Sequence, residues 1–510
     1  MNSVLTNRSS RRTLLQGAAG AAAVFQGGLA QSAAAQTDTP STPEASTPIA
    51  LTPIPSGISE DTFADLDAYI SGRMEELKVP GVALGILGGG MQHLAGFGVT
   101  NVNHPLPVGE DTIFEIGSIS KPVTGTAIMR LVEQGDLDLD APVQTWLPEF
   151  RVADEAASSD VLLRHLVTHT AGWYDGADPE TGRGDDALAK LVESMATLPQ
   201  VTPPGEYFSY NNTGMCLAGR VIEAVTEQPY ERAVADLVLQ PLGMEHSHFF
   251  PEEMMAESFV VGHVLPPGAS EPVVAEPWSL PRAMNPAGGM LASVTDLMQF
   301  ARLHLGDGTI EGTPIVDAST LQFMQSELGP GGTVPSARSP IEALGVNWLL
   351  YDQGGERIVS HAGGANGQLA VLIMVPSQQF ALVMMTNAEA GLGLAFEVTD
   401  RVMMGMLGLP LPDHAVAPLT PEQQAEYVGK YVTPDGVQTI VVEEQDEGLA
   451  LQANIPGIGE VSTALRMIGD DLVIMEYMGL GIFADFVRDD TGRVAWMRFV
   501  GRLVPRESGN

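Results

Sequence analysis

A serine and a lysine are spaced so that the lysine can activate the serine. Ser118 precedes Lys121 by three residues, and the following apolar positions have helical spacing. Pro122 fits a helix only in its first turn, so the helix must begin near Ser118. Residues three apart on a helix share a face. A neutral lysine amine can take the proton of a serine hydroxyl, and burial and the positive helix end both favour that neutral form. The pair predicts a nucleophile and its base.

A tyrosine and an asparagine form a second candidate element. Tyr210 and Asn212 come just before a segment with helical apolar spacing, and an extended chain would turn both toward one cleft. A tyrosinate, or a tyrosine hydrogen-bonded to lysine, can pass the serine proton to a leaving group. An asparagine amide can hold a substrate carbonyl. The structural alternative is a surface tyrosine beside a helix-capping asparagine.

A histidine followed closely by glycines forms the third element. His361, Gly363 and Gly364 fall on a predicted late strand. Glycines allow a substrate backbone to approach closely, and a backbone N–H of this strand with that of Ser118 would form an oxyanion hole. The structural alternative is a glycine-rich bulge beside a buried histidine.

Taken in this order, the three elements resemble the boxes of the serine β-lactamase and penicillin-binding-protein-like family, nearest its class C and D-Ala-D-Ala-peptidase-like branch. Residues 163–172 and 285–290 agree, and the resemblance covers roughly residues 59 to 408. It implies an α+β fold in which an antiparallel sheet is flanked by helices and carries an inserted all-helical subdomain. It also implies a set of site residues: Ser118 as nucleophile, Lys121 and Tyr210 in proton transfer, Asn212 as a substrate contact, the Ser118 and Gly364 N–H groups as oxyanion hole, and His361 with Gly363 as the opposite wall.

Two departures from the family pattern bear on the substrate. His361 stands where many β-lactamases carry a lysine, and a histidine near neutral pH is charged only in part. The middle box reads Tyr210-Asn211-Asn212, so the deacylation apparatus of class A enzymes is not expected. Histidine variants of the third box resemble D-aminopeptidases, D-Ala-D-Ala peptidases and esterases.

The resemblance predicts a serine hydrolase that acts through a Ser118 acyl-enzyme on amide or ester bonds, in D-amino-acid peptides, esters or β-lactam-like substrates. One alternative is a true class C-like β-lactamase, and another is a penicillin-binding sensor or scaffold with little or no turnover. The expected partner is a small-molecule or peptide substrate, with no cofactor and no metal. The natural substrate and the oligomeric state, including a homo-oligomer, stay open.

The elements that must position these boxes come from both ends of the hydrolase region. Apolar spacing predicts a helix over 59–77, and strands are expected at 82–87 and 92–99 around three glycines. Further strands are expected at 345–351, 358–361, 368–375 and 380–387. Their short connections favour antiparallel pairing, so the sheet would combine the first and last strands of a domain over 58–409.

A separate β domain is expected at the end of the chain. A proline-bearing joint at 410–421 is followed by short apolar alternations and turns such as Pro434-Asp435-Gly436. This pattern predicts a small antiparallel barrel or sandwich over 421–507. It resembles the lipocalin-like domain often appended to such hydrolases, and its role stays open.

The start of the chain predicts export. Arg11 and Arg12 precede a mild apolar stretch from Leu14 to Ala30, and Ala33-Ala34-Ala35 offers a cleavage site, so residues 1–36 are expected to be a twin-arginine-type signal peptide. An ordinary secretory signal is the alternative. Residues 37–57 are rich in Pro, Ser and Thr and read as a linker. We therefore expect a periplasmic or extracellular protein without stable membrane insertion after signal removal.

Composition limits the other functions. The formal net charge is −38, which disfavours binding to nucleic acid or anionic lipid. Cys216 is the only cysteine, so no internal disulfide can form, and we expect it to be a buried core residue.

Overall fold

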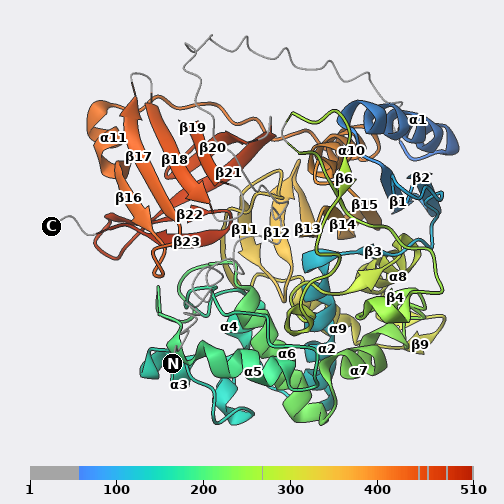
Figure 1. Cartoon of the computed structure of the whole chain (residues 1–510), viewed down its shortest axis with the longest axis horizontal. Helices are drawn as coiled ribbons and strands as arrows, with labels where there is room; N and C mark the ends of the chain where they lie inside the picture. The colour runs from blue at the N-terminus through green and yellow to red at the C-terminus, as the bar shows by residue number, and fades with distance from the viewer. Residues whose placement is uncertain (1–56, 267, 446–447, 456–458, 478–479, 508–510) are drawn as a thin grey trace, which may run out of the picture.

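The computed structural model describes residues 57–266, 268–445, 448–455, 459–477 and 480–507 (Figure 1). The predicted signal peptide and nearly all of the predicted linker lie outside these residues. Within the described part of the chain, no helix combines the length and apolarity needed to cross a bilayer.

An eight-stranded antiparallel sheet forms the centre of the first domain. Its strand order is β10-β11-β12-β13-β14-β15-β1-β2, so strands from the two ends of the domain are neighbours. Val82 of β1 lies opposite Thr386 of β15. The predicted combination of first and last strands is therefore confirmed. The bounds are β1 Gly81–Gly88, β2 Met91–Gly98, β10 Gly329–Gly332, β11 Ile341–Leu344, β12 Leu349–Gln353, β13 Glu356–Ala365, β14 Gln368–Val375 and β15 Phe380–Thr386.

The sheet is covered on both faces, because successive side chains of a strand point to opposite sides. In β1, Val82 and Leu84 belong to one apolar core, whereas Ala83 belongs to the other. Helices α1 (Glu60–Leu77) and α10 (Gly391–Gly405) cover the first face, and α8 (Val294–Leu305) covers the second. Burial on both faces explains why β14 and β15 are continuous apolar runs.

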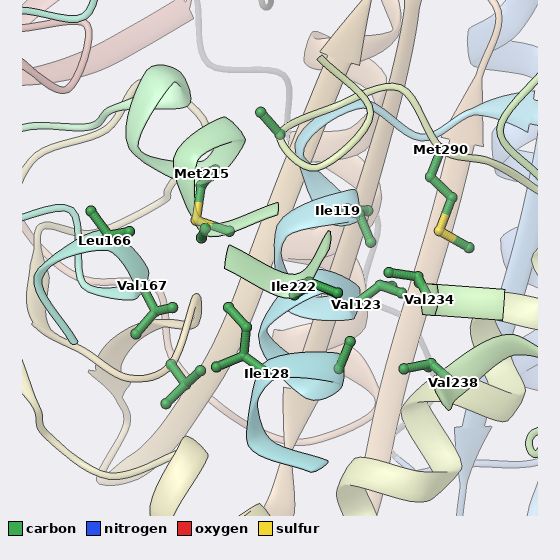
Figure 2. Packing of buried hydrophobic residues seen from close by; sticks show 14 of the residues in the cluster. Ile119, Val123, Ile128, Leu166, Val167, Met215, Ile222, Val234, Val238 and Met290 are labelled. Carbon is green, nitrogen blue, oxygen red and sulfur yellow. The ribbon is translucent and has the colours of Figure 1, made fainter. Parts of the chain in front are cut away.

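Most of the remaining helices form the inserted helical subdomain. They are α2 (Ser120–Gln134), α3 (Glu155–Asp160), α4 (Leu163–Val167), α5 (Ala187–Ser194), α6 (Asn212–Thr226) and α7 (Tyr230–Val234), with α9 (Ala318–Met324) following α8. Figure 2 shows Val123 and Ile128 of α2 packed among side chains such as Ile222 of α6. This packing surrounds the first turns of α2 with apolar groups.

Several two-residue strands lie outside the main sheet. β3 (Phe114–Glu115), β7 (Leu291–Ala292) and β4 (Ser247–His248) form a three-stranded sheet. Of these strands, β3 directly precedes the serine turn and α2 in the chain. The pairs β5 (His263–Val264) with β6 (Val273–Val274), and β8 (Thr309–Ile310) with β9 (Thr313–Pro314), complete the domain.

The last domain is an eight-stranded antiparallel barrel, drawn in orange to red in Figure 1. Tyr431 of the first strand forms a bridge with Arg506, which directly follows the last strand, and the Glu507 N–H donates to the Lys430 carbonyl (2.7 Å). The barrel prediction is confirmed. After the short helix α11 (Pro421–Tyr427) come β16 Gly429–Val432, β17 Thr439–Gln445, β18 Gly448–Ile455, β19 Gly459–Met467, β20 Leu472–Tyr477, β21 Leu480–Arg488, β22 Val494–Phe499 and β23 Arg502–Pro505.

Candidate active site

Ser118 lies in a short 3-10 turn, Gly117–Ile119, directly before α2. The sequence predicts a helix that begins near Ser118. The α-helix itself begins two residues later, at Ser120, and Pro122 falls in its first turn. Lys121 is on the face next to the serine, with its Nζ 2.8 Å from Ser118 Oγ. The Nζ also donates to the Ala287 carbonyl at 2.5 Å. The lysine is thus held against the hydroxyl.

Lys121 is fully buried, and this environment changes its protonation. Burial lowers the pKa of the ammonium from its ordinary value to about 7; nearby Asp175 opposes this shift and the positive charge of Arg502 adds to it. A large fraction of the lysine is therefore the neutral amine near pH 7. Its geometry and protonation both suit a base for Ser118.

Tyr210 and Asn212 flank Asn211, the N-cap residue of α6, and Asn212 is the first residue of the helix. Asn211 caps this helix by accepting the Gly214 N–H (2.7 Å). Burial raises the pKa of the Tyr210 phenol, and a hydrogen bond with Ser118 opposes this only in part. The phenol therefore stays protonated near neutral pH, which disfavours a tyrosinate. Lys121 Nζ lies 4.8 Å from the centroid of the Tyr210 ring.

Asn212 is buried, and its Oδ1 has no hydrogen-bond partner in the described part of the chain. A buried amide oxygen without a partner is costly, which is consistent with a contact that a substrate completes.

The glycines of β13 allow the strand to pass against the nucleophile. A Cβ placed on Gly363 would lie 2.6 Å from Ser118 N, and one placed on Gly117 would lie 2.5 Å from Gly364 N. Gly117 also has a φ of 54°, which favours glycine. The backbones of β13 and of the serine turn are thus in direct contact. The two N–H groups suggested for an oxyanion hole belong to these two segments.

His361 differs from the expectation that it would be partly charged. It is buried, and its Nδ1 is 2.8 Å from the Ala362 carbonyl, to which it donates. Burial, together with the nearby positive charge of Lys121, lowers the pKa of this histidine to about 3. His361 is therefore neutral at neutral pH. It cannot replace the fixed cation that a lysine would supply.

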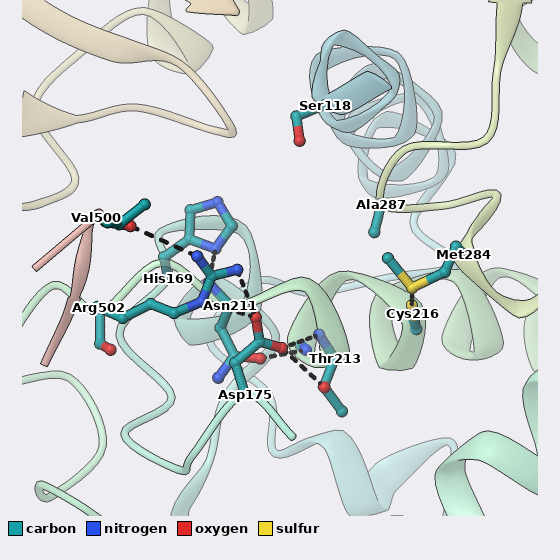
Figure 3. Close-up of polar contacts among 12 residues, drawn as sticks. Ser118, His169, Asp175, Asn211, Thr213, Cys216, Met284, Ala287, Val500 and Arg502 are labelled. Carbon is teal, nitrogen blue, oxygen red and sulfur yellow. Dashed lines mark hydrogen bonds and ion pairs between the residues drawn. The ribbon is translucent and has the colours of Figure 1, made fainter. Parts of the chain in front are cut away.

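Two residues of the hydrolase domain to which the sequence gave no role at the site also lie there. His169 stacks on the Tyr210 ring at 4.5 Å between centroids, and its Nδ1 accepts the Asn211 N–H (3.2 Å). It belongs to the stretch 163–172 that supported the family resemblance. Asp175 is buried and accepts hydrogen bonds from the N–H and Oγ1 of Thr213, both at 2.9 Å (Figure 3).

The barrel also reaches the site, which no sequence pattern indicated. The hairpin between β22 and β23 contacts three consecutive residues before α6. Arg498 Nε donates to the Phe208 carbonyl (3.0 Å), the Leu503 N–H to Ser209 Oγ (3.2 Å), and the Tyr210 N–H to the Gly501 carbonyl (2.8 Å). The barrel thus helps to hold the segment that carries the tyrosine.

A pocket open to solvent, with about 480 Å³ of space not filled by atoms, is lined by residues of the serine turn, the start of α6, β13 and the β22–β23 hairpin. Its lining contains Ser118, Tyr210, Asn212, Val334, Pro335, Ser336, Leu349, His361, Ala362, Val500 and Arg502. An adjoining space of about 360 Å³ shares His361 and Ala362 with it and continues toward Phe396. Among the residues that the structure describes, His, Cys, Asp and Glu side chains form no group of three that could hold a metal ion.

Comparisons with protein families and with solved structures match this chain to β-lactamases and penicillin-binding proteins. The family model described as "Beta-lactamase" matches residues 66–402. "Penicillin-binding protein 4" of Amycolatopsis lactamdurans is 32% identical over 348 residues, which cover 68% of this chain and 91% of that protein. The crystal structure of SurE superposes with a TM-score of 0.71 at 27% identity, covering 87% of this chain and 99% of SurE; SurE has also been crystallised with D-Leu. The octameric penicillin-binding protein homologue from Pyrococcus abyssi shares the fold, with a TM-score of 0.57 at 23% identity, covering 87% of this chain and 100% of that one.

Proposed function

Because this chain belongs to the Beta-lactamase family, we propose that it is a serine hydrolase that forms an acyl-enzyme on Ser118. The observation that carries the proposal is the contact between the buried Lys121 amine and Ser118 Oγ at 2.8 Å. A lysine with a pKa lowered to about 7 is matched to a general base near neutral pH.

The acylation step follows from the positions of these groups. Neutral Lys121 takes the hydroxyl proton as Ser118 Oγ attacks the substrate carbonyl carbon. The negative charge that develops on the carbonyl oxygen is stabilised by the N–H groups of Ser118 and Gly364. When the bond to the leaving nitrogen or oxygen breaks, Tyr210 donates its phenolic proton to that atom and is reprotonated from Lys121. Deacylation repeats these steps with water as the nucleophile.

The proposed substrates are amides or esters, with D-amino-acid peptides and esters favoured over β-lactams. SurE, the more similar solved structure, was crystallised with D-Leu, which supports a site for D-residues. The neutral His361 lacks the fixed positive charge of the lysine that many β-lactamases carry at this position, so this wall of the site differs from theirs. Because one relative is named a penicillin-binding protein, a penicillin sensor that acylates slowly is the second candidate function.

Export to the periplasm or beyond remains part of the proposal and rests on the predicted signal over residues 1–36. A homo-oligomer is also proposed only by analogy, because a protein of the same fold is octameric.

Intact mass measured after brief exposure to three acylating reagents tests the proposal. We expect a fluorophosphonate, a penicillin and a D-amino-acid ester to leave adducts on the wild type and none on Ser118→Ala. The reagent whose adduct decays identifies the class of substrate that turns over. A persistent penicillin adduct alone would favour the sensor. Adducts that persist in Ser118→Ala would refute the role of Ser118.

A further inference from the structure

Arg502 brings a positive charge from the barrel into the wall of the pocket. It is the first residue of β23, and the pocket around Ser118 counts it among its lining residues. Its guanidinium carbon lies 5.5 Å from the centroid of the Tyr210 ring. The other side chain of this lining that can carry a positive charge, His361, is neutral at neutral pH. Arg502 therefore supplies the permanent positive charge of the pocket wall.

One edge of the guanidinium is fixed by the hydrolase domain. Nε and Nη2 of Arg502 donate to Asp175 Oδ2 at 3.2 and 2.9 Å. Asp175 is held in turn by Thr213, so the arginine cannot change its direction freely. Nη1 makes a long contact of 3.5 Å to the Val500 carbonyl. A guanidinium has five donors in a planar fork, so the Nη1 edge keeps the capacity to bind a second carboxylate.

The turn that carries this wall is strained. Val500 and Gly501 form the two-residue loop between β22 and β23, with φ values of 51° and 80°. Such a loop favours Asn-Gly, and a β-branched residue in the left-handed region is disfavoured. Strain of this kind persists where the surrounding structure requires it, and it is frequent at ligand sites. Here it places Val500 and Arg502 together in the pocket lining.

We propose that Arg502 binds a carboxylate on the leaving group of the substrate, so that the barrel selects esters and peptides whose cleaved portion ends in a free carboxylate. This inference rests on the proposed function. The leaving group is the relevant side because Arg502 lies over Tyr210, the residue that would give the leaving atom its proton. A local cation is also needed to attract an anion to a chain with a net charge of −38.

Two matched substrates test the inference: N-acetyl-D-alanyl-D-lactate, which has a free carboxylate, and the corresponding D-lactamide. For the wild type, we expect kcat/KM to be about tenfold or more higher for the acid than for the amide, since hydrogen bonds to charged groups contribute that much. In Arg502→Gln the ratio should fall toward one through a higher KM for the acid. Arg502→Lys keeps the charge without the fork and should give an intermediate ratio. Arg466→Gln removes a charge from an exposed position of β19 and should leave the ratio unchanged.

The outcomes separate this inference from the proposed function. A wild-type ratio near one would overturn the inference, whether or not the variants fold. An equal loss on both substrates in Arg502→Gln would also overturn it, because Arg502 would then only position Tyr210. Absence of both a fluorophosphonate adduct and turnover in the wild type would instead overturn the proposed function, and the inference with it.

Discussion

Replacing Gly363 by alanine adds one methyl group where β13 passes against the nucleophile. The new Cβ would lie 2.0 Å from the Ile116 carbonyl oxygen and 2.6 Å from Ser118 N. Non-bonded heavy atoms are normally about 3.5 Å apart. Both neighbours are backbone atoms that cannot rotate away, so the strand and the serine turn must separate by roughly 1 Å.

This separation should reduce catalysis much more than stability. A displacement of about 1 Å in an active site can cost about 10²-fold in rate, and loss of one oxyanion donor costs about 10²- to 10³-fold. We therefore expect kcat to fall about 10²- to 10³-fold in Gly363→Ala. Overpacking of this size costs about 1–3 kcal/mol of stability, which a domain of this size tolerates.

The assay is kcat for an uncharged ester, together with the rate of fluorophosphonate labelling and the melting temperature. Gly393→Ala in α10 is the matched control, because its Cβ would meet only Leu480 Cδ2 at an ordinary 3.7 Å. It should keep the wild-type kcat. If folded Gly363→Ala kept kcat within about twofold of wild type, the close approach of β13 would not be needed for catalysis, and the oxyanion-hole assignment would be wrong.

Three further predictions concern protonation and the domain interface. Since neutral Lys121 is the active form and its pKa is lowered to about 7, kcat/KM for an uncharged ester should rise about tenfold per pH unit below pH 7 and level off above it; a flat profile from pH 5.5 to 8 would exclude lysine as the base. Arg498→Met should lower the free energy of unfolding in urea by about 3 kcal/mol, because it removes the ionic partner of the largely enclosed Asp485 carboxylate, which would keep only the Thr333 hydroxyl as a donor; an unchanged midpoint would contradict this. Burial raises the pKa of Glu115 from its ordinary value of 4.5 to about 8. Between these two pH values the folded protein keeps a proton that the unfolded chain loses, so stability falls as the pH rises toward 8. Glu115→Gln removes that loss, and its stability relative to wild type should increase between pH 5 and pH 9; a constant difference would refute a neutral Glu115.

The local sequence pattern was sufficient to predict the helix and the strands that carry the three boxes. Helical spacing placed Lys121 beside Ser118, and the structure puts the two side chains 2.8 Å apart. Apolar runs bounded by glycine turns located β1 and β2 within a residue or so, because such runs and turns are recorded in each segment by itself. The short strands β10 and β11 were missed, since Gly329–Gly332 has no apolar alternation. The catalytic roles of the site residues stay predictions.

The sequence by itself determined the order of the three boxes, the antiparallel α+β plan and the presence of a terminal β domain, since these depend on spacing and local periodicity. Only the tertiary structure decided which groups are charged and which elements share the site. A pKa depends on burial and on charges brought from elsewhere in the chain, so His361 is neutral at neutral pH and the pKa of Lys121 falls to about 7. In the same way, Arg502 meets Asp175 across 327 residues of sequence, a distance over which no local pattern carries information.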